Sequence, residues 1–276
     1  MPTFDRDPLA AAGAASTRAA PLVALLLATG CGTLEAAPPI ATDLDGPADG
    51  FEVSDGWVNG EMYGCGWRRD NARFDDGQLT LILDDQRSRG RNYSCAEYRT
   101  REHYGYGYYE TRMRVTPAEG TVSAFFTYTG EPFADPQDEI DFEFLGRDTR
   151  YVQVNYFVDG KGGHEKMIDL GFDAADGFHT YGFDWQPDAI RWYVDCKLVH
   201  EVTAAAGPLP SVPGRIYLHL WNGQGVDGWL GRFRYPGEPI TATYDYVRHE
   251  PGAGNAPEGS GCAAAEAPSV QAAVTE

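Results

Sequence analysis

Residues 137–145 read Gln-Asp-Glu-Ile-Asp-Phe-Glu-Phe-Leu, a segment in which acidic and apolar side chains alternate. Successive side chains of a β-strand point to opposite faces, so Glu139, Asp141 and Glu143 share one face of this segment. The apolar residues that alternate with them share the other face, which we expect to pack into a core. The segment therefore predicts a β-strand that carries three acids on its open side.

Seven other short segments have the same character. They are aromatic or β-branched, mostly alternate in polarity, and are separated by Gly, Pro, Asn and Asp at intervals typical of antiparallel sheets. These segments are residues 109–115, 123–129, 152–158, 179–185, 190–194, 216–221 and 243–248. No helix of three turns is predicted after the N-terminal region. We expect an all-β protein, a sandwich of two antiparallel sheets packed face to face.

Length and composition narrow the class of protein. The 276 residues are 42% hydrophobic and 23% charged, which favours one large β domain with a sizeable core. The formal net charge of -19 makes a nucleic-acid partner unfavourable, because a polyanion would be repelled. The 13 Phe, 6 Trp and 16 Tyr suit a carbohydrate-binding surface and equally a β core.

The N-terminal region has the features of an export signal. Residues 19–28 form an apolar run that follows Arg18 and is shorter than the ~20 residues of a membrane-spanning helix. The next residues lead to Cys31 and resemble a bacterial lipobox, although Ala28 stands where leucine is usual. We expect an exported protein, either a cell-surface or outer-membrane lipoprotein anchored through Cys31 or a secreted protein.

Composition also predicts the domain boundaries. We expect a signal peptide at residues 1–31, a linker at 32–50, a folded domain at 51–250 and a low-complexity tail at 251–276, because the two flanking segments are rich in Ala, Pro and Gly and show no periodicity. Four cysteines remain after Cys31, at positions 65, 95, 196 and 262. In an oxidising compartment they can pair in three ways, and none has metal-site spacing.

The three acids admit two interpretations. A strand face in contact with solvent is the simpler one, but like charges at alternate positions repel, and ordinary surfaces mix the two signs. Hydrolysis of a glycosidic bond requires two carboxyl groups that flank the bond. The Cα atoms of Glu139 and Glu143 lie ~13 Å apart on a strand, and leaning side chains can bring their carboxyls within roughly 5–7 Å. This interval spans both the retaining and the inverting geometry.

The acidic segment resembles the catalytic strand of glycoside hydrolase family 16, and its neighbours resemble the bacterial lichenases of that family. The resemblance covers residues 51–248 and is carried in order by residues 51–60, 95–99, 104–107, 125–130, 162–166, 177–181, 184–187 and 220–223. It implies a jelly-roll β-sandwich of the concanavalin A type, with the acidic strand on a concave sheet. It also implies hydrolysis of β-1,4 linkages in mixed-linkage 1,3-1,4-β-glucan with retention of configuration and without a cofactor.

The resemblance assigns roles to individual residues. Glu139 is then the nucleophile, Glu143 the general acid and base, and Asp141 the residue that hydrogen-bonds the nucleophile. The positions that match the sugar-binding residues of lichenases are Asn59, Glu97, Arg99, Phe126, Tyr128, Gln153, Asn155, Trp221 and Trp229. Each of these nine has a structural alternative, as a core ring or a surface pair. Asp184, Trp185 and Trp192 are expected to be structural only.

The resemblance further implies a disulfide between Cys65 and Cys95, which leaves Cys196 and Cys262 as the other expected pair. Cys196 stands where the family has a turn glycine. A calcium site recurs in the family, and Gly77 and Asp245 match two of its positions. Such an ion would stabilise the fold at a distance from the chemistry.

Four positions depart from the lichenase pattern. Gln137 and Trp57 replace a tryptophan and a tyrosine, and Phe157 and His219 replace a tyrosine and an asparagine. Gln137 and His219 could alter the preference for substrate, so a xyloglucan- or laminarin-active enzyme of the same family is one alternative. A non-catalytic glucan-binding lectin on the same sandwich is another, although no catalytic carboxyl group is lost. Scattered histidines and the lack of a Gly-x-Ser-x-Gly segment disfavour zinc and serine hydrolases. We expect a monomer.

Overall fold

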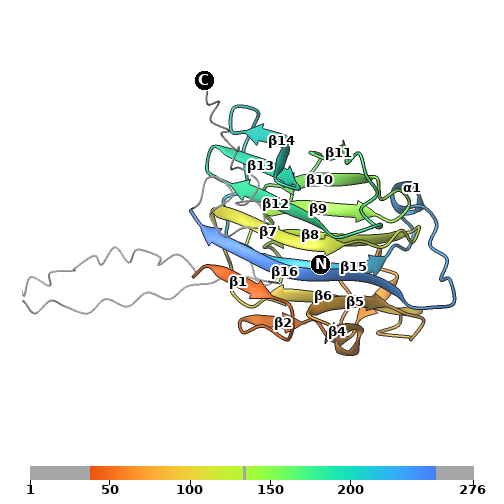
Figure 1. The fold of residues 1–276 in the computed structure, drawn as a ribbon. Coiled ribbons are helices and arrows are strands. Elements are labelled where there is room, and N and C mark those ends of the chain that lie inside the picture. The colour runs from red at the N-terminus through yellow and green to blue at the C-terminus, as the bar shows by residue number, and fades with distance from the viewer. Residues whose placement is uncertain (1–37, 133–134, 253–276) are drawn as a thin grey trace, which may run out of the picture. The chain divides into compact units, whose positions relative to one another are not determined.

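The computed structural model describes residues 38–132 and 135–252 (Figure 1). The predicted signal peptide, Cys31, Cys262 and nearly all of the predicted tail lie outside these residues. Within residues 38–132 and 135–252, no helix is long and apolar enough to span a membrane.

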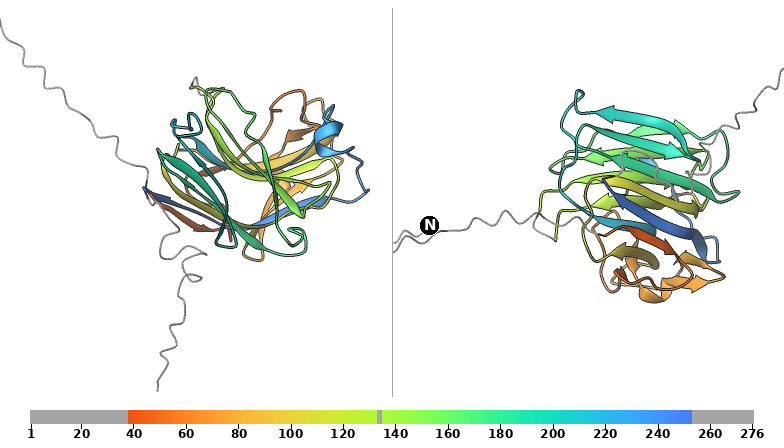
Figure 2. Two further views of the ribbon diagram at one scale, coloured as in Figure 1. Left: turned by 90° about the horizontal axis from the view of Figure 1, so that it is seen from above. Right: turned by 60° about the vertical axis from the view of Figure 1, so that its left-hand side comes forward.

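The described residues form two antiparallel sheets of eight strands each, which lie as two curved layers (Figure 2). The back sheet has the strand order β14 (Lys197–Thr203), β13 (Ala189–Val194), β12 (His179–Trp185), β7 (Gly107–Arg114), β16 (Ile240–Pro251), β5 (Gln78–Leu83) and β4 (Ala72–Asp75), with β1 (Ile40–Asp43) paired to β16. The site sheet has the order β11 (Lys166–Asp169), β10 (Tyr151–Phe157), β9 (Glu139–Leu145), β8 (Thr121–Tyr128), β15 (Arg215–Asn222), β6 (Tyr93–Thr100) and β2 (Phe51–Val53), with β3 (Cys65–Trp67) paired in parallel to β6. The only helices among the described residues are η1 (Arg69–Asn71) and α1 (Asp227–Leu230).

The core lies between the two sheets, as the alternation in residues 137–145 predicts. Phe142 and Phe144 on β9 have no exposed surface, and their rings contact Tyr181 of β12 at centroid distances of 5.7 and 4.7 Å. Phe125 on β8 contacts Phe183 on β12 in the same way, at 5.5 Å. Because these rings occupy one face of β9, the three acids must lie on the opposite face, away from the back sheet. The all-β, two-sheet fold is therefore confirmed.

All eight predicted strands are present, and the structure adds eight others. Those missed are mostly short or at an edge, such as β2, β3 and β11, where few residues alternate. The longest one missed is β6, in which charged side chains interrupt the apolar pattern. Strand pairing there is decided by backbone hydrogen bonds to β2 and β15, which the side-chain pattern does not report.

The predicted linker boundary at residue 50 is wrong. Residues Ile40 to Asp43 form β1 and pair with residues Tyr246 to His249 of β16, and Leu44 has no exposed surface. The Ala, Pro and Asp composition conceals this strand because its stability comes from the ladder with β16 and not from a row of apolar side chains. The folded domain accordingly begins before residue 51.

The disulfide between Cys65 and Cys95 is present and joins β3 to β6. Cys196 is also disulfide-bonded, while Cys262, its predicted partner, lies outside the described residues. Asp195 and Cys196 form the turn between β13 and β14 with φ angles of 44° and 66°. These angles lie in the left-handed region that glycine adopts most easily, which explains why the resembling family has a glycine at this turn.

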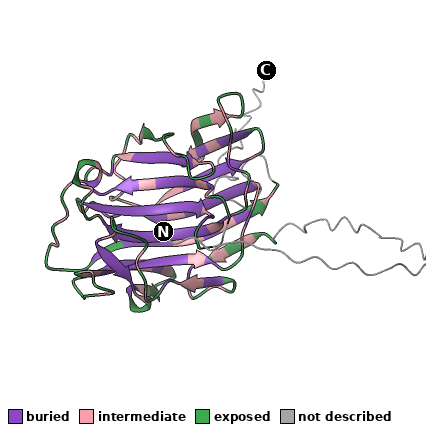
Figure 3. Cartoon of the chain, turned by 180° about the vertical axis from the view of Figure 1, so that it is seen from behind, coloured by how far each residue is buried: buried purple, intermediate pink, exposed green. Residues whose placement is uncertain are grey.

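Cross-sheet hydrogen bonds connect the back sheet to the strands that carry the site. The indole Nε1 of Trp192 on β13 donates to the backbone carbonyl of Asp141, at 3.1 Å. The Tyr244 hydroxyl on β16 donates to the carbonyls of Ala124 and His219, at 3.0 and 3.2 Å. In the view onto the site sheet, β8 and β15, which carry Ala124 and His219, are almost entirely buried (Figure 3). The strands under the site are thus held from behind by buried polar contacts.

Candidate active site

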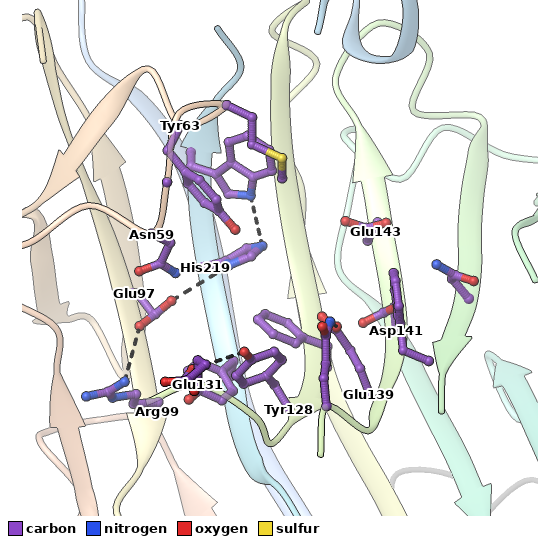
Figure 4. Close-up of a pocket in the computed structure, with 18 of the residues that line it drawn as sticks. Asn59, Tyr63, Glu97, Arg99, Tyr128, Glu131, Glu139, Asp141, Glu143 and His219 are labelled. Carbon is purple, nitrogen blue, oxygen red and sulfur yellow. Dashed lines mark hydrogen bonds and ion pairs between the residues drawn. The ribbon is translucent and has the colours of Figure 1, made fainter. Parts of the chain in front are cut away.

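A cleft of about 1280 Å³ lies over the open face of the site sheet. Side chains from β6, β8, β9, β10 and β15 form its floor, and residues 57–63 form part of one wall. Glu139, Asp141 and Glu143 lie on one side of the cleft, and Glu97, Arg99 and His219 lie on the other (Figure 4).

The three acids of β9 have no charged neighbour directly across either adjacent strand. The register places an aromatic ring, an amide or a small residue at every such position. On β8 and β10 respectively, these neighbours are Tyr128 and Phe157 for Glu139, Phe126 and Asn155 for Asp141, and Ala124 and Gln153 for Glu143. Like charges at alternate positions are unfavourable without cations, so the arrangement costs stability that a structural role would not require.

Glu139 has two hydrogen-bond donors. The amide Nε2 of Gln137 donates to its Oε2 at 2.8 Å, and the side chain of Asp141 is a second partner. Burial raises the pKa of Glu139 to about 7, and the two hydrogen bonds act in the opposite direction.

Glu143 accepts a hydrogen bond from the amide of Gln153, and a second hydrogen bond, from Trp229, fixes the orientation of that amide. Gln153 Nε2 donates to Glu143 Oε2 at 3.0 Å, while Trp229 Nε1 donates to Gln153 Oε1 at 3.1 Å. Burial, together with the charges of Glu139 and Glu165, raises the pKa of Glu143 to about 8, while the hydrogen bond from Gln153 acts in the opposite direction. Both glutamates thus have raised pKa values, and the charge of Glu139 favours the protonated form of Glu143.

Asp141 lies between them and is 3% exposed. Burial raises its pKa well above its usual value, with the two flanking glutamates adding to the effect. A protonated Asp141 can donate to an ionised Glu139, which is the direction in which their hydrogen bond stabilises both groups. The three titrations are coupled, and together they leave one ionised and one protonated glutamate along the same strand. Such a pair can attack a carbon and protonate a leaving oxygen.

The opposite side of the cleft holds a second buried carboxyl group. Glu97 on β6 is 1% exposed, burial raises its pKa to about 7, and Ser54 Oγ donates to its Oε1 at 2.5 Å. His219 on β15 is its direct cross-strand neighbour, and Trp221 Nε1 donates to His219 Nε2 at 3.0 Å. Burial lowers the pKa of His219 to about 3, so the ring is neutral and its proton is assigned to Nδ1.

Glu97 and His219 leave two polar atoms available to a ligand. His219 Nδ1 lies 4.0 Å from Glu97 Oε2, and neither atom has a hydrogen-bond partner among the described residues. Buried polar atoms without partners are costly, and a hydroxyl group can accept from one and donate to the other. This part of the cleft is therefore suited to a polyhydroxylated ligand.

Arg99 and Asn59 extend this polar wall. Arg99 Nε donates to Glu52 Oε1 at 3.0 Å, and its guanidinium lies 5.1 Å from the ring centroid of Trp57. Asn59 Oδ1 accepts hydrogen bonds from Trp57 Nε1 and Trp67 Nε1, at 3.1 and 2.8 Å. Aromatic rings and polar groups thus alternate along this side, as a carbohydrate-binding surface requires.

The structure brings every predicted catalytic and sugar-binding residue to this one cleft. The three acids, the nine predicted sugar-binding residues and the four departures at 57, 137, 157 and 219 all line it. Trp221 and Phe126 also belong to the buried core, so they serve both the functional and the structural interpretation. Contact with a sugar stays a prediction for each of them.

Sequence reasoning missed other lining residues. Tyr217 on β15 has the same side-chain period as His219 and Trp221, and that alternation could have identified it. Tyr63, Glu131 and Glu165 lie between or outside regular strands, where no period marks the face of a side chain. Tyr63 packs on Trp221 at a centroid distance of 4.1 Å, which places it at the wall of the cleft.

The Asp245 side chain and carbonyl, predicted to help hold calcium, both have protein partners. The Asp245 carboxylate pairs with Arg112 at 2.6 Å, and its backbone carbonyl accepts from Leu44 N at 2.9 Å. Gly77 lies in the turn before β5, near Asp245, because Tyr244 pairs with Leu79. In the part of the chain that is described, no group of three or more His, Cys, Asp or Glu residues could hold a metal ion.

Comparisons with known proteins agree with this geometry. The model of the family described as Glycosyl hydrolases family 16 matches residues 59–247. A Beta-glucanase of Paenibacillus macerans is 51% identical over 200 residues, which cover 72% of this chain and 82% of that protein. The solved structure of a Bacillus licheniformis beta-glucanase is 43% identical, with a TM-score of 0.73, and covers 78% of this chain and 99% of its own. A beta-1,3-1,4-glucanase (lichenase) structure derived from a mouse hindgut metagenome is 44% identical with the same TM-score, and covers 77% and 99%.

Proposed function

Because the chain belongs to glycosyl hydrolases family 16, we propose that it is a retaining endo-glycosidase that cleaves the β-1,4 linkages of mixed-linkage 1,3-1,4-β-glucan. It is a glycoside hydrolase, and its substrate is a β-glucan polysaccharide. One observation supports the proposal most directly. Three carboxyl groups line a cleft from a single strand whose neighbours bring no cation opposite them.

The reaction begins with Glu139 ionised and Glu143 protonated. Glu139 attacks the anomeric carbon and forms a covalent glycosyl ester, while Glu143 gives its proton to the departing glycosidic oxygen. The charge of Glu139 raises the pKa of Glu143, which favours a protonated Glu143 beside an ionised Glu139 and supports this division of roles. No cofactor is needed, because the two carboxyl groups supply both the nucleophile and the proton.

The second step reverses the proton transfer. Once Glu139 is esterified it no longer carries a negative charge, so its contribution to the raised pKa of Glu143 is removed, while burial and the charge of Glu165 remain. Glu143 then takes a proton from a water molecule, and the resulting hydroxide releases the sugar from Glu139. Asp141 supports both steps through its hydrogen bond to Glu139.

The sugar is bound by the walls of the cleft. Hydroxyl groups suit the unpaired atoms of Glu97 and His219, and the rings of Trp221 and Phe126 suit the apolar faces of glucose units. Because Gln137 and His219 replace a tryptophan and an asparagine of the resembling enzymes, we expect any shift in subsite preference to arise at these two positions.

Export belongs to the same proposal. The apolar run at residues 19–28 supports a signal sequence, and the disulfide between Cys65 and Cys95 fits an oxidising compartment. We propose a monomer at the cell surface or outer membrane, anchored through a lipid on Cys31, with secretion as the alternative. Labelling cells with a radioactive fatty acid, for the native chain and for Cys31→Ser, tests the anchor.

A stabilising calcium ion near Gly77 and Asp245 also stays a prediction. The pairing of Asp245 with Arg112 argues against it, because a carboxylate that ligates calcium would have to leave that partner. A thermal melt of the full chain in calcium and in a chelator decides the matter. Equal midpoints would reject the ion.

The function is tested by assaying the purified protein on barley β-glucan, lichenan, laminarin, carboxymethylcellulose and xyloglucan, with the products identified. We expect cleavage of the first two alone and products with a 1,3-linked reducing end. Activity confined to laminarin or xyloglucan would keep the catalytic strand and change the substrate. Binding to glucan without cleavage of any of the five would instead indicate a lectin.

A further inference from the structure

Each catalytic glutamate accepts a hydrogen bond from its own glutamine. Gln153 holds Glu143, as described above, and belongs to the set of residues that match the lichenases. Gln137 holds Glu139 and stands where the resembling enzymes have a tryptophan. The hydrogen bond from Gln137 to Glu139 is therefore a property of this chain that the resemblance does not supply.

The backbone around Gln137 is fixed from both sides. The Gln137 carbonyl accepts from Gly160 N at 2.9 Å, and the carbonyl of the next residue, Asp138, accepts from Thr129 N at 3.0 Å. The buried Asp138 carboxylate accepts three backbone N–H groups, from Asp159, Ser211 and Val212, at 3.0, 2.7 and 3.0 Å. Because Asp138 is tied to two other segments, the position from which Gln137 reaches Glu139 is set before any substrate binds.

Gly130 lies close to the Cβ of Gln137 and limits the space around it. Gly130 has a φ of 143°, and a Cβ placed there would lie 3.1 Å from the Gln137 Cβ and 2.9 Å from the Tyr128 hydroxyl. A residue larger than glycine at position 130 would therefore push against the glutamine. Gln137 is itself partly buried, so its Cβ is packed beside Gly130 while its amide contacts Glu139.

We propose that Gln137 is a positioning residue for the nucleophile. Its amide and the Asp141 side chain hold the Glu139 carboxylate between two donors, so that the carboxylate is ionised and fixed in orientation when the sugar arrives. The inference rests on the proposed function, in which Glu139 is the nucleophile. It extends that function by a residue that acts through Glu139 and makes no bond to the reacting atoms.

Other titratable groups also face Glu139. Asp141 and Glu143 lie on the same strand, Tyr128 faces it from β8, and Tyr63 faces it from the loop before β3. Burial raises the pKa of both tyrosines, and the charge of Glu139 raises it further. The tyrosines are therefore neutral wherever the glutamates titrate. A change in the acidic limb of the pH profile reports on the β9 acids and their donors.

The first test replaces Gln137 by methionine, which has a similar length and no donor. A hydrogen bond to a charged group is strong enough that its loss should lower kcat about 10-fold at pH 6, with KM changed less than about 2-fold. The acidic limb of the kcat profile should move upward by about one pH unit, because Glu139 without this donor is harder to ionise. Gln137→His, which offers a ring N–H donor, should recover part of both effects.

Two matched variants control the experiment. Gln153→Met removes the amide that faces Glu143, and it should move the basic limb upward and leave the acidic limb in place. Gln186→Met removes an amide that donates to the buried carboxylate of Asp184 at 2.7 Å, away from the cleft. It should leave both limbs unchanged. Thermal melts of all variants show that each is folded at the assay temperature.

The outcomes separate the inference from the function on which it rests. If the native protein cleaves β-glucan and Gln137→Met keeps its kcat and its acidic limb, Gln137 has no positioning role and the function stands. If the native protein cleaves none of the glucans, the function fails. A ¹³C NMR titration of Glu139 in the native protein and in Gln137→Met then still decides whether the amide holds the carboxylate, since an unchanged pKa would overturn it.

Discussion

Two strands of this sandwich carry outward-facing rows of very different character. On β9 of the site sheet the row is Glu139, Asp141 and Glu143, all acidic. On β7 of the back sheet the row is Tyr108, Glu110, Arg112 and Arg114, which mixes a hydroxyl, an acid and two bases. Both strands turn their alternate residues into the same core, so the packing of that core does not explain the difference.

The carboxyl groups of the two rows have different partners. Glu110 has no exposed surface, and its two oxygens accept hydrogen bonds from the hydroxyls of Tyr108 and Tyr246 at 2.9 and 2.8 Å. Arg112 pairs with Asp245 at the neighbouring strand. On β9 the acids have only amides and each other. A carboxyl group on β7 therefore stabilises the fold, whereas those on β9 reduce its stability in favour of chemistry.

The largest expected effect is a loss of hydrolysis when an acid of β9 is replaced, with no such loss when the acid of β7 is replaced. Glu139→Gln and Glu143→Gln should each lower β-glucan hydrolysis by about 10³-fold or more, because one removes the nucleophile and the other the proton donor. Release of reducing sugar from barley β-glucan measures the loss. Glu110→Gln makes the same chemical change on β7 and should keep native turnover per folded molecule. Near-native turnover of either β9 variant would contradict the assigned roles.

The next effect concerns stability and its dependence on pH. Glu143 has a pKa of about 8 in the folded protein, above its unfolded value, so the folded state binds the proton more tightly and the native protein loses stability as pH rises from about 4.5 to 8. Glu143→Gln cannot ionise and should escape that loss. We expect its melting temperature to equal that of the native protein near pH 4 and to exceed it by on the order of 5 °C near pH 8. A constant difference at all pH values would show that the pKa is not raised.

A smaller effect of opposite sign is expected on β7. Glu110→Gln replaces a charged acceptor of two tyrosine hydroxyls by a neutral one and should cost about 1–2 kcal/mol. The melting temperature near pH 7 should fall by roughly 4 °C, measured by circular dichroism. A rise in melting temperature would show that the two rows do not differ in the way proposed.

The smallest effect concerns the exposed ion pair beside Glu110. Arg112 and Asp245 are partly exposed, so Asp245→Asn should cost less than about 1 kcal/mol, and the cost should fall in 1 M salt. Chemical denaturation at low and high salt measures both. A loss of several kcal/mol that appears only when calcium is present would indicate that Asp245 serves a metal ion instead.

Local pattern was sufficient for the elements that matter most to the chemistry. The period of two in residues 137–145 determined that three acids share a face and that Phe142 and Phe144 lie in the core. Similar patterns identified eight strands. They missed β1, because a strand held by its backbone ladder to β16 leaves no mark in side-chain polarity. They also missed Tyr63, because no alternation exists in the loop that carries it.

By itself, then, the sequence determined the fold class, the acidic face of β9 and, through resemblance, the residues to examine. Tertiary structure alone decided the partners of those residues. Glu97, Phe126, Glu139 and His219 meet because β6, β15, β8 and β9 are adjacent in the site sheet, although they are far apart in the chain. The hydrogen bond from Gln137 to Glu139 likewise depends on Asp138 being held by residues 159, 211 and 212. Side-chain period is a local property, whereas strand order, register and burial arise from non-local contacts, and these contacts set the pKa values on which the reaction depends.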